Sequence, residues 1–430
     1  METKSAAEIV RKNYEMYGKY INLEGRVVLS EGDGLKAVQR RILYSAYRIA
    51  SNRTVKTATL VGETMGKYHP HGDASIATAV AGLVRDGLLV GVGNFGSTVG
   101  LDTIEPAAMR YTECKLDPRI LKLAFKYIND VPFFTNDLSF EEPEYIPTPL
   151  PLSLCHLNET EEDFVSGIGF GISYTVPKFE VNELFELLKD LVNNKPVKNN
   201  VHIRYRSLKV PCSDELFNTG KGTVITTGRY VVNKDKKSFN IIELPIMGKG
   251  YSTEKLLAPF DSIPQDFSKD TTNVFIELPR GKTVDDYDLD ELLTTKCSVD
   301  MYFHDGNVIK HYSLPDILLT TYKYYKAAVL ENINKRIGKL KEQIRITELL
   351  IKMKPYLNPM NEKTPERVKK ALKLDDKTVE ELMKYTIKQI CLAEKNLQNV
   401  KDELTDWTDK KNHLDKFCLD EIENSLRKEK

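Results

Sequence analysis

A tyrosine beside an arginine, Tyr111 after Arg110, is the pair in this sequence best suited to covalent chemistry. A free phenol has a pKa near 10, so it is a weak nucleophile at neutral pH unless nearby cations favour the phenolate. An adjacent guanidinium and a second cation would do this, and they would also stabilise the charge that develops when the oxygen attacks a phosphodiester. The same pair fits an ordinary surface tyrosine, so its meaning depends on the surrounding segments.

Charge is distributed unevenly along the chain. The 430 residues contain 62 Lys and Arg and 62 Asp and Glu, a formal net charge of zero, which excludes a uniformly basic nucleic-acid-binding coat. Residues 36–72 nevertheless contain seven Lys or Arg and one acid, whereas residues 136–163 contain eight acids and no Lys or Arg. The basic segment indicates a local surface for phosphate contact.

Three helices are expected in and around the basic segment. Apolar spacing predicts them at 35–50, 58–68 and 74–85, and the string His69-Pro70-His71-Gly72-Asp73 separates the last two. Asp73 is expected to cap the third helix with its carboxylate. Two short helices joined by a tight turn are typical of a helix-turn-helix-like DNA reader, although an unrelated helical hairpin has the same pattern.

Three further motifs suggest other chemistry, and their contexts argue against it. Residues 91–96 match G-x-G-x-x-G, but the next four residues make a poor helix start, so dinucleotide binding is not expected. The acids of 286–291 fit a helix start better than a Mg²⁺ site. His69 and His71 have no third ligand nearby, and the six scattered cysteines form no C-x-x-C pair, so no metal site is predicted.

The rest of the chain predicts an α+β region followed by a long helical arm. A proline-rich connection at 143–151 leads into a glycine-rich turn at 166–171, a helix at 181–192, and strands at 222–227, 239–244 and 273–278. Apolar residues then follow a heptad-like spacing over 330–351 and again over 390–414. Two such helices predict an antiparallel coiled-coil arm with a helical knob at about 356–386.

Several strings occur together in the order of a known family. They are Arg26 with Asp33-Gly34-Leu35-Lys36 and Arg40-Arg41, then Gly66-Lys67-Tyr68-His69-Pro70-His71-Gly72-Asp73, Gly93-Asn94-Phe95-Gly96-Ser97 and Ala107-Ala108-Met109-Arg110-Tyr111-Thr112-Glu113. The sequence resembles the breakage-reunion subunit of type IIA DNA topoisomerases, which includes the gyrase A subunit, its topoisomerase IV counterpart and the medium subunit of phage enzymes. The resemblance implies a helical, winged-helix-type DNA-binding domain at 1–147, an α+β tower domain at 148–319 and a coiled-coil exit-gate arm at 320–430.

The resemblance also implies roles for individual residues. Tyr111 would attack DNA and hold its 5′ end as a phosphotyrosyl ester, while Arg110 and Arg26 would stabilise the pentacovalent phosphate. Ile168 would insert between base pairs as an apolar wedge that bends the cleaved duplex. The positions that match DNA-contacting residues of the family are Lys36, Arg40, Arg41, Lys67, His69 and His71.

By the same resemblance the chain is expected to be half an enzyme. Two copies would form a homodimer on double-stranded DNA, and Mg²⁺ and ATP would be held by an ATPase and TOPRIM-type partner subunit. With no signal pattern and no apolar run long enough for a membrane span, the expected location is the bacterial cytoplasm or an infected host cell. No DNA-wrapping domain is recognised, so relaxation or decatenation is expected rather than negative supercoiling, as in a short phage-like subunit.

Two departures from the family pattern and two alternatives qualify the hypothesis. Val27-Val28-Leu29-Ser30 and Ala37 replace the usual Ala-Leu-Pro-Asp and proline, which changes a turn and leaves the charged positions intact. Ala74 and Thr78 replace the serine and acid that anchor quinolones in many bacterial members, so weak drug sensitivity is expected. The alternatives are a catalytically inactive, architectural DNA-binding homologue and a helix-turn-helix regulator with a coiled-coil dimer arm.

Overall fold

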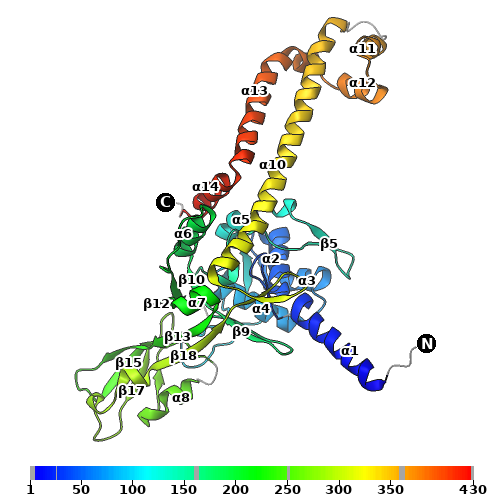
Figure 1. The fold of residues 1–430 in the computed structure, drawn as a ribbon. Coiled ribbons are helices and arrows are strands. Elements are labelled where there is room, and N and C mark those ends of the chain that lie inside the picture. The colour runs from blue at the N-terminus through cyan, green and yellow to red at the C-terminus, as the bar shows by residue number, and fades with distance from the viewer. Residues whose placement is uncertain (1–4, 26, 159–163, 249–251, 358–363, 428–430) are drawn as a thin grey trace. The chain divides into compact units, whose positions relative to one another are not determined.

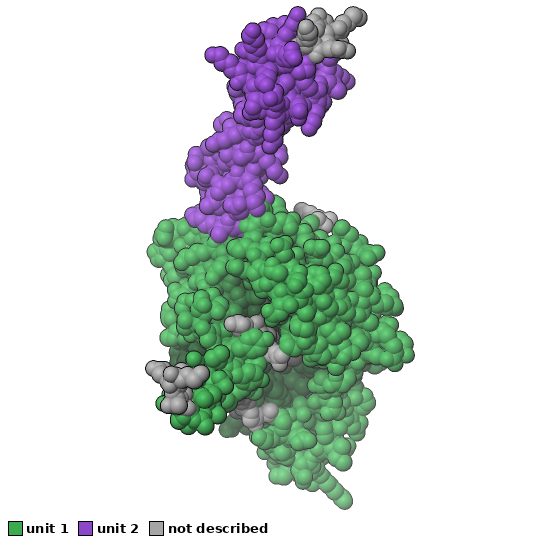
Figure 2. Space-filling view, turned by 90° about the vertical axis from the view of Figure 1, so that its right-hand side faces the viewer, with its two compact units in different colours: residues 1–325, 422–430 green, residues 326–421 purple. Residues whose placement is uncertain are grey.

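The computed structural model describes residues 5–25, 27–158, 164–248, 252–357 and 364–427 (Figure 1). The chain divides into two compact units, residues 1–325 with 422–430, and residues 326–421 (Figure 2). Helices and mostly antiparallel sheets are mixed, as the α+β prediction requires. Among the described residues, no helix is both long and apolar enough to span a membrane.

The first unit begins with helices and a small antiparallel sheet. Three helices lie within two residues of their predicted bounds, namely α2 (Ala37–Ala50), α3 (Thr57–Lys67) and α4 (Asp73–Arg85). Each buries one apolar face, with Ile42, Leu60 and Ile76 fully inaccessible. The elements before them are α1 (Ala6–Lys19) and the π-helix η1 (Tyr20–Gly25). The sheet has the strand order β2 (Val55–Lys56), β4 (Glu113–Leu116), β3 (Leu89–Val92).

The predicted cap of α4 is wrong by one residue. Gly72 occupies the N-cap position, and Asp73 is the first residue of the helix. The Asp73 carboxylate accepts a hydrogen bond from the N–H of Ala74 at 2.9 Å rather than from one further along the helix. A carboxylate in the first helical turn still interacts favourably with the helix dipole, which explains why an acid fits there.

The α+β part of the first unit contains three four-stranded sheets, with the orders β12-β11-β10-β7, β13-β18-β9-β8 and β14-β15-β17-β16. The predicted helix at 181–192 is present with those bounds, and the three predicted strands are present within one residue at each end. The elements between β4 and the last of these sheets are α5 (Pro118–Ala124), β5 (Phe133–Thr135), β6 (Glu141–Pro143), β7 (Cys155–His156), β8 (Val165–Ile168), β9 (Ser173–Val176), β10 (Lys178–Glu180), α6 (Val181–Val192), β11 (His202–Tyr205), β12 (Leu208–Pro211), α7 (Asp214–Thr219), β13 (Lys221–Thr227), β14 (Arg229–Val232), β15 (Ser238–Glu243), α8 (Thr253–Leu257), β16 (Gln265–Asp266), β17 (Val274–Glu277), α9 (Leu289–Leu292) and β18 (Thr294–Asp300).

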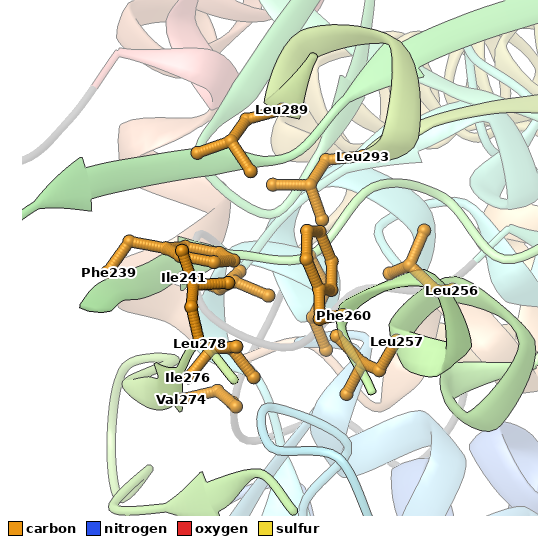
Figure 3. Close-up of a cluster of buried hydrophobic side chains, with 11 residues drawn as sticks. Phe239, Ile241, Leu256, Leu257, Phe260, Val274, Ile276, Leu278, Leu289 and Leu293 are labelled. Atoms are coloured by element: carbon orange, nitrogen blue, oxygen red, sulfur yellow. The ribbon is translucent and has the colours of Figure 1, made fainter. Parts of the chain in front are cut away.

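A cluster of buried side chains stabilises the sheet that contains β15 and β17 (Figure 3). Phe239 from β15 meets Phe260 edge to face, with 5.1 Å between the ring centroids. Leu293, which follows α9, packs into the same cluster and is fully buried. Burying a side chain of this size contributes about 1.5–3 kcal/mol, so this cluster holds its sheet and the short helices together.

A further, three-stranded sheet, β1-β19-β20, connects distant parts of the first unit. β1 (Leu29–Ser30) runs parallel to β19 (Tyr302–His304), and β20 (Ile309–His311) pairs antiparallel with β19. The buried Glu31 carboxylate accepts hydrogen bonds from the hydroxyls of Tyr324, at 2.9 Å, and Tyr312. The segment after Arg26 is therefore fastened to the residues that begin the long helix α10 (Leu314–Met353).

The second unit contains long antiparallel helices with two short helices between them, which is compatible with the predicted coiled coil. Ion pairs between α10 and α13 (Ile387–Asn412) show that the two helices are antiparallel, because Arg336 pairs with Glu403 whereas Glu348, further along α10, pairs with Lys401, which comes earlier in α13. Between them lie α11 (Thr364–Leu372) and α12 (Asp376–Met383), whose buried Val368 and Leu382 share a core with both long helices.

The heptad-like spacing over 390–414 predicted one unbroken helix to residue 414, and this prediction is wrong. α13 ends at Asn412, His413 leaves helical geometry, and α14 (Leu414–Leu426) begins one residue later. Lys411, which falls at a heptad position within 390–414, is exposed. The heptad spacing did not reveal the break because Leu414 keeps the apolar periodicity across it.

Candidate catalytic and nucleic-acid-binding site

Tyr111 lies in a turn at the end of the loop that joins β3 to β4. Its N–H donates to the carbonyl of Ala108 at 2.8 Å, which closes the turn, and its side chain is 67% exposed. A nucleophile that acts on a duplex must be reachable from outside the fold. The phenol of Tyr111 meets that requirement.

Two backbone hydrogen bonds hold this turn against the first residues of α3. The N–H of Thr57 donates to the carbonyl of Thr112 at 3.0 Å, and that of Ala58 donates to Met109 at 3.1 Å. The first N–H groups of a helix have no partner within it, so the helix start and the turn satisfy each other. The buried Thr112 hydroxyl also donates to the Thr57 hydroxyl at 2.8 Å. The backbone of Tyr111 is thus held between two anchored neighbours.

Arg110 places its cation over the ring of Tyr111. Its guanidinium carbon lies 4.6 Å from the centroid of the Tyr111 ring, a cation–π arrangement that places positive charge on the face of the ring. Arg26, the second cation predicted for the phosphate, lies outside the described residues.

Arg40 points into the protein and forms an ion pair with Asp33, which is fully buried. Its Nη2 donates to Asp33 Oδ1 at 3.0 Å, and Asp33 also accepts from the N–H groups of Leu35 and Ile146. Burial opposes the charged form of Arg40, but the charge and hydrogen bonds of Asp33, together with the charge of Glu142, outweigh burial and raise the arginine pKa. The geometry gives Arg40 an internal partner, so its effect on DNA would pass through the turn that it holds.

Arg41 also has an internal partner, and it connects that partner to a histidine. Its Nε and Nη2 bind the carboxylate of the buried Glu142, with Nη2 2.8 Å from Oε1. Its Nη1 lies 3.1 Å from Nδ1 of His69. A guanidinium only donates, so Nδ1 of His69 accepts and the neutral ring carries its proton on Nε2. Glu142, Arg41 and His69 therefore form a chain that orients the imidazole.

His71 and Lys67 lie beside this chain. The His71 ring meets that of the buried His69 edge to face with 4.3 Å between centroids, and its own side chain is half-buried. Lys67, 39% exposed, pairs with Glu63 at 2.8 Å and lies over the ring of Phe140. The described part of the chain thus brings Arg41, His69, His71 and Lys67 into one neighbourhood.

Lys36 and Ile168 are joined through the hairpin of β8 and β9. The ammonium of Lys36 donates to the carbonyl of Ser166 in β8 at 2.6 Å, and burial lowers its pKa, partly offset by the charge of Asp86. Ile168, the last residue of β8, is 77% exposed. It borders a cleft of about 930 Å³ that is also lined by Arg206, Lys221 and Lys296, among others. The glycine-rich turn predicted at 166–171 is shorter than expected, because 166–168 are part of the strand.

Sequence reasoning missed the residues that hold these groups in place. Glu142 is one of eight acids in 136–163, and nothing in the sequence separates it from the other seven. Asp33 was noted only as part of a string, and Thr57 carried no signal. The uneven distribution of charge gave a weak signal, because ion pairs are expected to form between a basic and an acidic segment of similar size.

The structure shows the local geometry of the motifs that were set aside in the sequence. No helix follows the G-x-G-x-x-G string, and Gly93 takes a positive φ of 105° in a loop that passes Thr112. Asp288 caps α9 by accepting from Glu291, as expected for a helix start. Within the described ranges, no group of three or more His, Cys, Asp or Glu side chains is placed to hold a metal ion.

Comparison with known proteins adds an independent line. The family model for the A subunit of DNA gyrase/topoisomerase IV matches residues 26–429. The DNA topoisomerase 4 A subunit of Neisseria gonorrhoeae is 34% identical over 266 residues, which are 54% of this chain and 33% of that protein. The DNA gyrase A subunit of Borreliella burgdorferi is 28% identical over 397 residues, 81% of this chain and 47% of that protein. The chain spans less than half the length of either relative.

Proposed function

Because the chain belongs to the family of DNA gyrase and topoisomerase IV A subunits, we propose that it is the DNA-cleaving and religating subunit of a type IIA topoisomerase. The observation that carries this proposal is Tyr111, an exposed phenol on an anchored turn with the Arg110 guanidinium over its ring. A protein that only binds DNA has no need for a nucleophile presented in this way.

The reaction is a transesterification. The Tyr111 oxygen forms a bond to a backbone phosphorus as the bond from phosphorus to the 3′ oxygen breaks, and the phenolic proton is lost while the 3′ oxygen gains one. The phosphotyrosyl ester keeps the energy of the broken bond, so resealing requires no ATP. Arg110 and Arg26 stabilise the charge on the pentacovalent phosphate, because a guanidinium donates several fixed hydrogen bonds to phosphate oxygens.

DNA is held along the surface that carries the remaining site residues. Lys36, Lys67 and His71 contact its backbone, and Ile168 enters between base pairs beside the cleft lined by Lys221 and Lys296. Two further arginines, which pair with buried carboxylates, act indirectly. Arg40 holds the turn at Asp33, and Arg41 orients His69 toward the scissile region.

Each region of the chain has a part in this mechanism. Residues 1–147 form a winged-helix-type DNA-binding domain, which agrees with three helices and a three-stranded sheet. Residues 148–319 form the tower domain, and residues 320–430 the coiled-coil arm of an exit gate. Each copy supplies one Tyr111 and a duplex has two strands, so the working form is a homodimer with double-stranded DNA.

The other chemistry comes from a partner subunit. Mg²⁺ and ATP are held by an ATPase and TOPRIM-type partner, and bound Mg²⁺ supplies positive charge at the scissile phosphate. The holoenzyme works in the cytoplasm, where the six cysteines of this chain, all among the described residues and none in a disulfide, stay reduced.

Adduct formation tests the proposal. The chain is mixed with its partner subunit, supercoiled DNA, Mg²⁺ and ATP, then denatured, and protein linked to DNA 5′ ends is measured. The wild type and Tyr356→Phe, which changes another exposed tyrosine, are expected to form adducts, and Tyr111→Phe is expected to form none. Equal adduct yields from the wild type and Tyr111→Phe would refute the assignment. DNA binding with no adduct from the wild type would instead identify an architectural homologue.

A further inference from the structure

The tip of the hairpin that carries Ile168 is clamped by the N-terminal segment, 148 residues away in sequence. The Asn22 carboxamide makes two hydrogen bonds to the backbone of one residue, Phe170. Its Nδ2 donates to the Phe170 carbonyl at 2.8 Å, and its Oδ1 accepts from the Phe170 N–H at 3.0 Å. Asn22 is 8% exposed, so these bonds are shielded from water. The carboxamide of Asn22 thus pairs with both backbone groups of Phe170, as a residue of a neighbouring strand would.

Two aromatic rings reinforce this clamp. Tyr14 and Tyr17, both on α1, meet the Phe170 ring edge to face, each with 5.4 Å between ring centroids. Asn22 itself lies in the π-helix η1. π-Helical turns are rare in proteins, and those that do occur are often found at functional sites.

The residue next to the wedge has no room for a side chain. A Cβ on Gly169 would overlap with Oδ1 of Asn22 and would lie 3.1 Å from Cγ1 of Val27. Glycine at this position lets the clamp close directly beside Ile168. Lower on the hairpin, the Tyr174 hydroxyl donates to the carbonyl of Val27, so the same N-terminal segment holds the hairpin at two levels.

We propose that Asn22 is a positioning residue for DNA bending, which acts by holding the Ile168 hairpin rigid against the duplex. The inference rests on the proposed function. Unstacking a base step costs a few kcal/mol, so the wedge must be held firmly. The hairpin joins its four-stranded sheet through one residue pair, Thr175 of β9 with Asp300 of β18, and this pair does not reach the tip at Ile168. The tip therefore needs support from elsewhere, because two paired strands alone are only marginally stable. Asn22 supplies that support through the backbone of Phe170 and does not itself contact DNA.

The test measures bending separately from binding. A duplex labelled at both ends is mixed with Mg²⁺, the full chain and its partner subunit; energy transfer reports the bend while anisotropy reports the affinity. Asn22→Leu keeps the volume of the side chain and removes both hydrogen bonds. We expect the bent fraction to fall about tenfold, with affinity changed less than about threefold, since backbone groups left without partners favour a displaced hairpin.

Three further variants make the result interpretable. Asn199→Leu is the matched control, because Asn199 also makes two hydrogen bonds, to Cys212 and Asp214, and these lie away from the hairpin. It is expected to bend DNA like the wild type. Gly169→Ala, which pushes Asn22 aside, is expected to behave like Asn22→Leu. In an Ile168→Ala background, Asn22→Leu is expected to cause no further loss of bending, because the two residues act as one unit.

Each outcome separates this inference from the proposed function. If Ile168→Ala lowers bending and Asn22→Leu does not, the positioning role is refuted while the wedge stands. If Asn22→Leu lowers bending equally with and without Ile168, Asn22 is merely structural, which also refutes the role. If Ile168→Ala leaves bending unchanged, the wedge assigned under the proposed function is wrong and the inference falls with it.

Discussion

Replacing Glu142 with glutamine tests whether the chain from Glu142 through Arg41 to His69 orients the imidazole. The Glu142 side chain is 5% exposed and that of Arg41 20%, so the substitution leaves a guanidinium in a largely buried position without its anion. Removing one partner of a buried ion pair costs about 3–5 kcal/mol. Because the glutamine oxygen still accepts one hydrogen bond, worth about 1 kcal/mol, we expect Glu142→Gln to lose about 2–4 kcal/mol of unfolding free energy.

Urea denaturation followed by circular dichroism measures this loss, and a surface pair provides the control. Glu63 pairs with Lys67, whose side chain is 39% exposed, so Glu63→Gln is expected to cost less than about 1 kcal/mol. The double variant Glu142→Gln with Arg41→Met is expected to recover much of the stability, because it removes the unpaired charge.

The same variants separate stability from chemistry. At a temperature where Glu142→Gln is folded, we expect adduct formation to fall, because His69 loses the orientation that Arg41 provides. The double variant is expected to stay impaired in cleavage although its stability recovers. A cost of under about 1 kcal/mol for Glu142→Gln, or wild-type adduct formation by the double variant, would refute the orientation argument.

Two further predictions follow from backbone geometry and from two histidines whose pKa is lowered. Gly220 has a φ of 70°, and a Cβ there would collide with the carbonyl of Tyr312. Gly281 has a φ of 87° but no atoms within 4 Å of such a Cβ, so Gly281→Ala is expected to cost about 1 kcal/mol of unfolding free energy from backbone strain alone. Gly220→Ala is expected to cost more, because the collision adds to the strain. Urea denaturation of the two variants compares them, and equal costs would contradict the collision. Burial lowers the pKa of His156 and of His304 to about 4. Below pH 6.5 the unfolded chain therefore binds more protons at these histidines than the folded chain does. The folded state keeps its full stability above about pH 6.5 and loses stability as the pH falls toward 4, by about 1–2 kcal/mol per histidine at pH 5. Denaturation at pH 7 and pH 5 measures this, and His304→Asn should flatten the dependence; an unchanged slope would count against it.

Sequence patterns predicted the helices well because each depends on local spacing. The apolar faces of α2, α3 and α4 are set by residues three and four apart, and their burial follows directly from that spacing. The clamp at Phe170 could not be predicted in the same way. Asn22 has no sequence signal, and its two hydrogen bonds reach 148 residues along the chain.

The basic segment shows most clearly why a site read from the sequence needs the fold. Four of its seven cations form ion pairs, namely Arg40 with Asp33, Arg41 with Glu142, Lys56 with Glu113 and Lys67 with Glu63. Only Glu63 lies inside the segment, so a count over 36–72 could not reveal this neutralisation. Each phosphate that a protein neutralises steepens the dependence of binding on salt by about 0.9 in logarithmic slope. Because paired cations contribute less to that slope, binding by this segment should depend on salt less steeply than seven free charges would require. If the proposed function is right, the same pairing gives the arginines of this segment an indirect part in the site. Arg40 and Arg41, held by internal carboxylates, would position a turn and a histidine, and the exposed cations would contact the DNA.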